Sequence, residues 1–174
     1  MKQETKQCIS DSIRTFRLPR YQEIPTVGLY LEQTTKYICE YLAPLQENAI
    51  TNSMISNYVK KRLVSNPVKK QYSRDQIAYL FFIAIGKNVL SLDALSDFFQ
   101  LQQRTYTVEK AYNYFCDEFE SLLQFSFEMK DSVDTLSGDD SDEKRLLHTC
   151  IAAVVQKIYL EKCLQAIVRE WEDE

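Results

Sequence analysis

Glycine and proline, the residues that most often end helices and build tight turns, are scarce in this chain of 174 residues, which has three glycines and four prolines. A sheet protein with many short strands needs more turn residues than this. Long helices are therefore expected. Because 45% of the residues are hydrophobic, the chain can bury a sizeable core. We predict an all-α fold.

Hydrophobic spacing predicts helices along most of the chain. Thr51 is a good N-cap residue, and Ser73 with Gln76 fits a capping box. Residues 63–72 contain Asn66-Pro67 and two lysines, which predicts an extended loop or hairpin instead of a helix. The expected helices cover residues 4–16, 29–42, 52–62, 75–85, 92–101, 107–129 and 144–171.

Charge is segregated along the sequence. Residues 48–74 hold six of the 21 basic residues and none of the 25 acidic ones, so the rest of the chain has 15 basic and 25 acidic residues. A stretch of charge +6 thus lies in a background of −10, which would present one positive face to a polyanion and repel it elsewhere. A solvated basic helix face is the alternative explanation.

The expected helix at 52–62 places apolar residues on one side and small polar residues on the other. Amide and hydroxyl groups can donate to and accept from DNA base edges, and the cations that follow can neutralise phosphates. Tyr58 fits a phosphate contact or a core position equally well, and Arg74 could instead brace the capping box. The predicted DNA contacts are Asn52, Ser53, Ser56, Asn57, Tyr58, Lys60, Lys61, Lys69, Lys70 and Arg74.

The order of these elements resembles the MerR-type winged helix-turn-helix. Residues 51–58 stand as its recognition helix, residues 63–72 as its wing, and the Tyr72-Ser73-Arg74-Asp75 run as the start of its third helix. The chain also resembles an uncharacterised bacterial family, domain-of-unknown-function family 1836. That likeness rests on residues 18–21, 54–60, 67–70 and 78–80 and covers about residues 18–123.

The resemblance implies a MerR-like winged fold without implying a ligand or promoter. MerR recognition helices usually carry arginines where this chain has Ser53 and Ser56. Phosphate binding would then depend on the lysines and on Arg74. We expect an arm and connector at 1–28, the winged domain at 29–101, and a two-helix dimerisation or sensing region at 107–174 with an acidic linker at 130–143.

Catalytic and metal-binding patterns are missing from the sequence. The one histidine, His148, has no partner at metal-ligand spacing, and no phosphate-binding glycine loop is present. Five scattered cysteines predict reduced thiols of a cytoplasmic protein. The polar residues 1–7 and the short apolar run at 77–86 predict no export signal or membrane span. We expect no enzyme, cofactor or metal.

The sequence therefore predicts a transcriptional regulator that binds double-stranded DNA. A homodimer is expected because one helical hairpin cannot cover the apolar surface of five large residues: Phe115, Phe119, Ile151, Ile158 and Trp171. An adaptor that uses the winged scaffold to bind another protein is the alternative. The target sequence, a small-molecule or protein effector, and the direction of regulation are not predicted.

Overall fold

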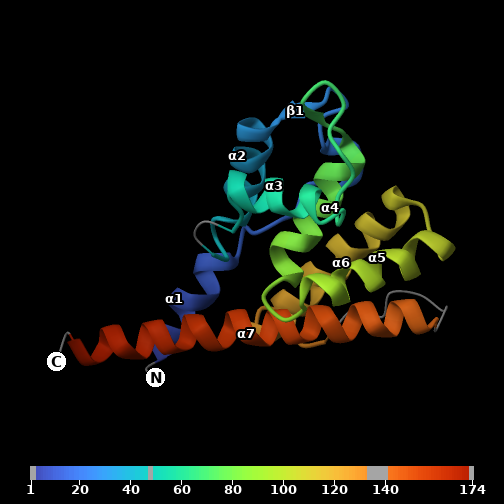
Figure 1. Cartoon of the computed structure of the whole chain (residues 1–174). Helices are drawn as coiled ribbons and strands as arrows, with labels where there is room; N and C mark the ends of the chain where they lie inside the picture. Colours follow the sequence, from blue (N-terminus) through green and yellow to red (C-terminus); the bar gives the residue numbers. More distant parts are fainter. Residues whose placement is uncertain (1–2, 47–48, 133–140, 173–174) are drawn as a thin grey trace. The chain divides into compact units, whose positions relative to one another are not determined.

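The computed structural model describes residues 3–46, 49–132 and 141–172. These residues form helices and one two-stranded antiparallel sheet (Figure 1). The predicted all-α fold is confirmed in its helical content. Contacts divide the chain into two compact units, which are described separately. Unit 1 comprises Met1–Arg17 with Asp117–Glu174, and unit 2 comprises Leu18–Cys116.

Unit 2 is built around α4, a helix that is apolar on all sides. Burial on every face explains why its residues show no amphipathic pattern, since neighbouring elements cover the whole circumference. The ring of Phe81 contacts Tyr37, Tyr41 and Tyr112 at centroid distances of 5.9, 6.0 and 6.1 Å. The elements of this unit are η1 (Tyr21–Glu23), β1 (Leu29–Tyr30), α2 (Leu31–Leu42), α3 (Asn52–Lys60), β2 (Gln71–Tyr72), α4 (Arg74–Gly86), α5 (Leu92–Thr105) and the first part of α6 (Val108–Ser126).

The small sheet joins two segments that are distant in sequence. Leu29 pairs with Tyr72, and Tyr30 pairs with Gln71. Gly28 comes directly before this pairing, and a Cβ on it would lie 2.8 Å from Gln71 Cβ. The absence of a side chain at Gly28 therefore lets the backbone approach β2 closely.

Unit 1 contains α1 (Gln3–Ile13), the second part of α6, and α7 (Asp142–Glu172). α1 packs against α7 (Figure 1). The Phe16 ring packs edge-on against Phe119 at a centroid distance of 5.9 Å. Ser10 donates a hydrogen bond to the Phe127 carbonyl at 2.8 Å. Aromatic packing and this cap-like contact together hold the amino-terminal arm in place.

Several predicted helix bounds need correction. The helix expected at 29–42 starts at Leu31, because Leu29 and Tyr30 pair with β2. The helix expected at 52–62 ends at Lys60, where Arg62 adopts a left-handed backbone. The helix expected at 92–101 continues to Thr105, and Gln102 accepts a hydrogen bond from the Tyr79 hydroxyl at 3.0 Å. Tertiary contacts thus moved the start of α2 and the end of α5, whereas local backbone geometry ended α3.

The compact units are divided differently from the predicted domains. The connector that begins at Leu18 belongs to unit 2, and so does the start of α6. Residues 1–17 of the predicted arm belong with α7 in unit 1. Of the acidic linker expected at 130–143, residues 133–140 lie outside the described residues.

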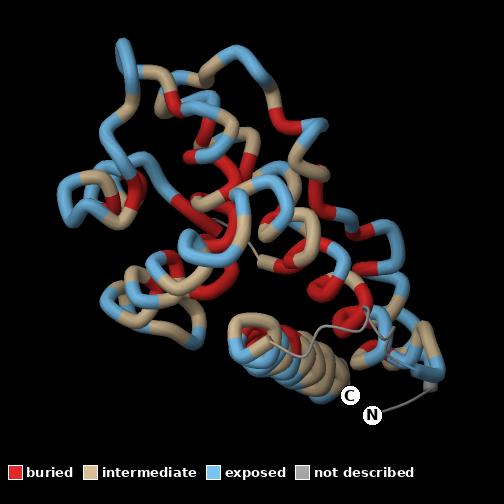
Figure 2. Tube along the Cα trace, turned by 90° about the vertical axis from the view of Figure 1, so that its right-hand side faces the viewer, coloured by how far each residue is buried: buried red, intermediate tan, exposed pale blue. Residues whose placement is uncertain are grey.

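Burial also changes the argument for a dimer. Phe115, Phe119, Ile151 and Ile158 are all buried within the chain, so they are not the surplus apolar surface that was predicted. Trp171 alone of the five is exposed. It ends a row of exposed apolar residues on α7. Figure 2 shows that the turns of α7 near the carboxyl terminus are coloured as intermediate or exposed. We call this row the α7 stripe: Leu160, Leu164, Val168 and Trp171.

No helix among the described residues has the length and apolar character that a membrane span requires.

Candidate nucleic-acid interface

The amino-terminal end of α3 is set by its capping residue. Thr51 has an extended backbone, and its hydroxyl accepts a hydrogen bond from the Met54 backbone N–H at 3.2 Å. This bond satisfies one of the donors left free at a helix start. The predicted start of the helix and its cap are confirmed. Ile55 and Tyr58 are buried, which fixes the rotation of α3 about its axis.

The outward face of α3 carries the predicted polar residues. Asn52, Ser53, Ser56 and Asn57 are all exposed. Asn52 Oδ1 accepts a hydrogen bond from the Thr35 hydroxyl at 2.6 Å, and Ser56 Oγ donates to the Asn52 carbonyl at 2.9 Å. The Asn57 side chain has no hydrogen-bond partner in the described part of the chain. Asn57 is thus the member of this face whose amide is most available to a ligand.

Tyr58 does not belong to that face. Only 4% of its surface is exposed, and burial raises the pKa of its hydroxyl. A side chain in the core cannot also reach a phosphate at the surface. We therefore correct the prediction of a DNA contact for Tyr58 to a packing role.

Arg74 also has a structural role. Its Nε donates to the Ile24 carbonyl at 2.8 Å, and its guanidinium lies over the Tyr21 ring at 5.2 Å from the centroid. A second nitrogen donates to the Gln22 carbonyl at 3.3 Å. These contacts hold the η1 turn against the start of α4. Arg74 therefore braces the connector. This role corrects the two that were predicted for it, a phosphate contact and a brace of the capping box.

The end of α3 and the following loop carry a cluster of cations. Lys60 and Lys61 close the helix, Arg62 follows them, and Lys69 with Lys70 form the tip of a hairpin turn. All five side chains are exposed, and none of them forms an ion pair with another described residue. We call this set the basic surface: Lys60, Lys61, Arg62, Lys69 and Lys70. Among residues 3–46, 49–132 and 141–172, no carboxylate compensates its positive charge.

A hairpin turn forms within residues 63–72, the segment predicted to be an extended loop or hairpin. Val68 and Gln71 exchange two backbone hydrogen bonds, of 3.1 and 2.9 Å, around a two-residue turn. β2 then pairs with β1, which comes from before α2. Gln76 anchors the loop to α4, because its Nε2 donates to the Ser65 carbonyl at 2.7 Å. The lysines at the tip are therefore carried on a braced loop.

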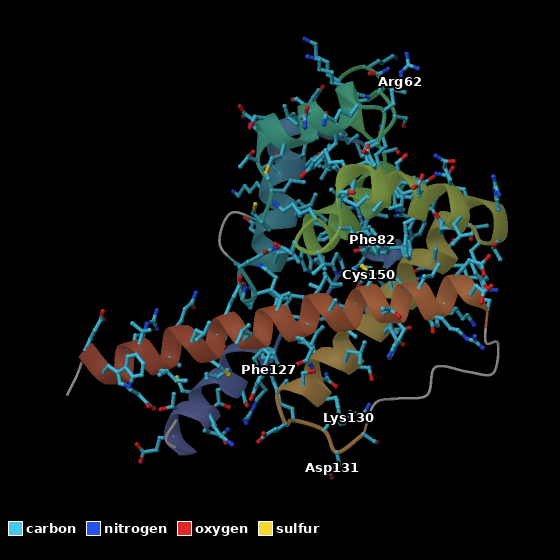
Figure 3. All side chains as sticks on the ribbon, turned by 60° about the horizontal axis from the view of Figure 1, so that its bottom comes forward. Arg62, Phe82, Phe127, Lys130, Asp131 and Cys150 are labelled. Carbon is cyan, nitrogen blue, oxygen red and sulfur yellow. The ribbon has the colours of Figure 1, made fainter. Side chains whose placement is uncertain are left out.

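Arg62 was missing from the predicted site. It was counted in the basic stretch and lay at the end of the expected helix 52–62, yet it was left out of the predicted DNA contacts. Figure 3 shows Arg62 at the outer edge of unit 2, with its side chain directed away from the helices. The available signal was its position directly after two lysines at the end of an amphipathic helix.

The candidate thiol and histidine residues do not form a second site. Cys116 Sγ is 3.8 Å from the Pro19 carbonyl, and burial raises the pKa of the Cys150 thiol to about 11. His148 Nδ1 contacts the buried Glu118 carboxylate. Within residues 3–46, 49–132 and 141–172, no three His, Cys, Asp or Glu residues converge as a metal site would require.

Comparison with known proteins places unit 2 in a family. The model of the family described as a domain of unknown function, DUF1836, matches residues 19–115, which is more than half of the chain and almost all of unit 2. No curated protein and no solved structure matches the chain. The chain therefore belongs to the DUF1836 family.

Proposed function

We propose that this protein is a transcriptional regulator that binds double-stranded DNA through the outward face of α3 and the basic surface. The observation that carries the proposal is the set of five exposed cations with no ion-pair partner among the described residues. Cations that are left unpaired beside a capped, polar-faced helix suit a phosphate backbone and the base edges next to it.

The arrangement of α2, α3 and the wing supports a MerR-like winged helix-turn-helix. α2 contacts α3 and α4, and β1 and β2 join the wing to the segment before α2. In this proposal α3 lies in the major groove and Lys69 and Lys70 contact phosphates beside it. Base contacts would come from amides and hydroxyls, and Asn57 is the first candidate because its amide has no competing partner.

A second copy of the chain is the proposed partner of the α7 stripe. Leu160, Leu164 and Trp171 lie on the order of 180° around the helix from Lys162, Ala166 and Arg169, at 3.6 residues per turn. The latter three line the groove between α7 and α1. The stripe is therefore on the face that α1 leaves uncovered, and it is between 46% and 69% exposed.

Two such stripes would bury several hundred Å² in a symmetric pair, which is less than a typical stable interface. The dimer is thus expected to be weak in solution and to strengthen on DNA, where both copies are held together. Two linked copies would place two α3 helices on a pseudo-palindromic site.

Binding to a fluorescent mixed-sequence duplex, measured by anisotropy over a range of salt concentrations, tests the proposal. Five phosphate contacts predict a slope of log affinity against log salt of about −4.5, so affinity falls about 500-fold between about 50 and about 200 mM. Changing Lys60, Lys61, Lys69 and Lys70 to Glu is expected to abolish binding. The control reverses four cations outside the basic surface: Arg104, Lys110, Lys157 and Arg169.

A protein-interaction adaptor is the second candidate, and the exposed α7 stripe is the observation that favours it. An adaptor would bind its partner through apolar contacts, which depend little on salt. No duplex binding at low salt, or equal binding by the charge-reversed protein and its control, would reject the DNA proposal and leave the adaptor.

A further inference from the structure

Left-handed backbone occurs at four non-glycine residues in the described chain: Arg62, Lys69, Lys70 and Glu128, with φ of 60°, 51°, 65° and 56°. Such φ values are unfavourable for any residue with a Cβ, and proteins usually place glycine or asparagine there. Three of the four residues are cations of the basic surface. An unfavourable backbone conformation that is shared by three cations needs a physical explanation.

Arg62 occupies the position where a helix normally has glycine. The Arg62 N–H donates to the Val59 carbonyl at 2.9 Å, and the Leu63 N–H donates to the Tyr58 carbonyl at 2.9 Å. These two bonds form a Schellman motif, whose left-handed residue is most often glycine. The Arg62 side chain is exposed and forms no hydrogen bond or ion pair with another described residue.

Lys69 and Lys70 form the two central residues of the wing turn. Positive φ at both positions is typical of a type I′ turn, for which Asn-Gly is strongly preferred. The flanking hydrogen bonds between Val68 and Gln71 are intact, at 3.1 and 2.9 Å. Neither lysine side chain has a partner among the described residues. The turn is therefore well formed with residues that are poor choices for its stability.

The surrounding structure holds this backbone in place. Val64 is 3% exposed, and Gln76 binds both the Ser65 carbonyl, at 2.7 Å, and the Ser65 hydroxyl, at 3.1 Å. The β1–β2 pairing restrains the other end of the loop. Anchors on both sides of the turn can maintain a conformation that the local sequence disfavours.

We infer that Arg62, Lys69 and Lys70 form a clamp for the phosphodiester backbone of duplex DNA, in which left-handed backbone directs the cations at the ligand at the expense of stability. The inference rests on the proposed function and adds Arg62 to it. It also assigns different roles to two parts of the interface: the clamp gives affinity for any duplex, and α3 gives sequence preference.

Glu128 provides an internal comparison. It has the same backbone conformation after α6, where Met129 N–H donates to the Gln124 carbonyl at 2.9 Å. It belongs to unit 1 and lies outside the basic surface. A glycine there should relieve strain in the same way as one at Arg62, without affecting DNA.

Substitution by the residues that each turn prefers tests the clamp in the full chain. The variants are Arg62→Gly, Lys69→Asn with Lys70→Gly, and Glu128→Gly as the matched control. All three are expected to raise the melting temperature by a few degrees. Only the first two are expected to weaken binding to mixed-sequence duplex, by about tenfold for each lost contact, and to reduce the salt slope by about 1 per cation. Arg62→Gln should weaken binding without raising the melting temperature.

The outcomes separate the two ideas. If the wild type binds duplex and the glycine variants bind equally well, the clamp is rejected and the DNA-binding function stands. If the wild type binds no duplex at low salt, both are rejected. Loss of affinity that varies with the duplex sequence would also reject the clamp, because phosphate contacts do not distinguish bases.

Discussion

The basic surface of unit 2 and the α7 stripe of unit 1 are both exposed, and they differ in how well water solvates their side chains. The basic surface consists of five cations without ion-pair partners among the described residues, and water solvates them well. The stripe consists of Leu160, Leu164, Val168 and Trp171, and water solvates these side chains poorly. The first surface therefore needs a polyanion only for function, whereas the second gains free energy whenever a protein covers it.

This difference separates the forces that act on the two surfaces. Electrostatic attraction to DNA is screened by salt within about 8–10 Å at ordinary ionic strength. Apolar association is nearly insensitive to moderate salt. The two proposed activities, DNA binding and dimerisation, should thus be separable by salt and by substitution in one unit at a time.

Removal of a core aromatic in either unit is expected to have the largest effect. Phe81 and Phe119 are both fully buried, in unit 2 and unit 1 respectively. Phe81→Ala or Phe119→Ala should each lower the free energy of unfolding by about 3–5 kcal/mol, as measured by denaturant titration. As denaturant is added, Phe81→Ala should lose DNA binding before dimerisation, and Phe119→Ala should lose dimerisation before DNA binding. Equal loss of both activities in both variants would contradict the assignment of one surface to each unit.

A charge on the stripe is expected to have the next largest effect. Leu164→Glu should raise the dimer dissociation constant at least tenfold, or about 1.4 kcal/mol, because a carboxylate would have to be buried on association. Sedimentation equilibrium measures this constant. Leu146→Glu is the matched control, since Leu146 is on the same helix and equally exposed, at 50% against 53%. Equal weakening by both variants would show that the stripe is not the contact.

A methyl group at Gly28 tests how firmly the hairpin at residues 63–72 must be held. The added Cβ would lie 2.8 Å from Gln71 Cβ and 3.3 Å from the Tyr72 carbonyl oxygen, so β2 must shift. Gly28→Ala is expected to cost about 1–3 kcal/mol and to weaken duplex binding, while dimerisation stays unchanged. Circular dichroism melts and anisotropy titrations measure the two effects. Unchanged duplex binding would indicate that the position of Lys69 and Lys70 is unimportant.

Loss of the α4 cap should give the smallest effect. Ser73 N–H donates to Gln76 Oε1 at 2.8 Å, and the Gln76 N–H donates to the Ser73 hydroxyl at 3.4 Å. Ser73→Ala is expected to lower stability by about 1 kcal/mol with the affinity of the folded protein for duplex unchanged. A change in affinity larger than the change in stability would place Ser73 in the interface itself.

Short-range features of unit 2 were predictable from the sequence. The starts of α3 and α4 depend on Thr51, Ser73 and Gln76, whose side chains bond to backbone within three residues. The two faces of α3 depend on helical spacing alone. Local hydrogen bonds and periodicity involve residues close together in the chain, and so they can be predicted from the sequence alone.

Features that depend on distant partners were missed or misassigned. The β1–β2 pairing joins Leu29 to Tyr72, and two residues are too short for a strand pattern. Arg74 was taken as a phosphate contact because its partners, the carbonyls of Gln22 and Ile24, precede it by about 50 residues. The residues chosen for the dimer were apolar, yet Phe115, Phe119, Ile151 and Ile158 are buried and only Trp171 is exposed.

By itself, the sequence determined the helical class, the basic stretch and the polar face of α3, because each follows from composition or from contacts a few residues apart. Tertiary structure alone decided which of those residues are available to a ligand. It buried Tyr58, engaged Arg74 in a brace, and placed Arg62, Lys69 and Lys70 on left-handed backbone. Availability is set by what packs beside a side chain, and packing partners come from anywhere in the chain.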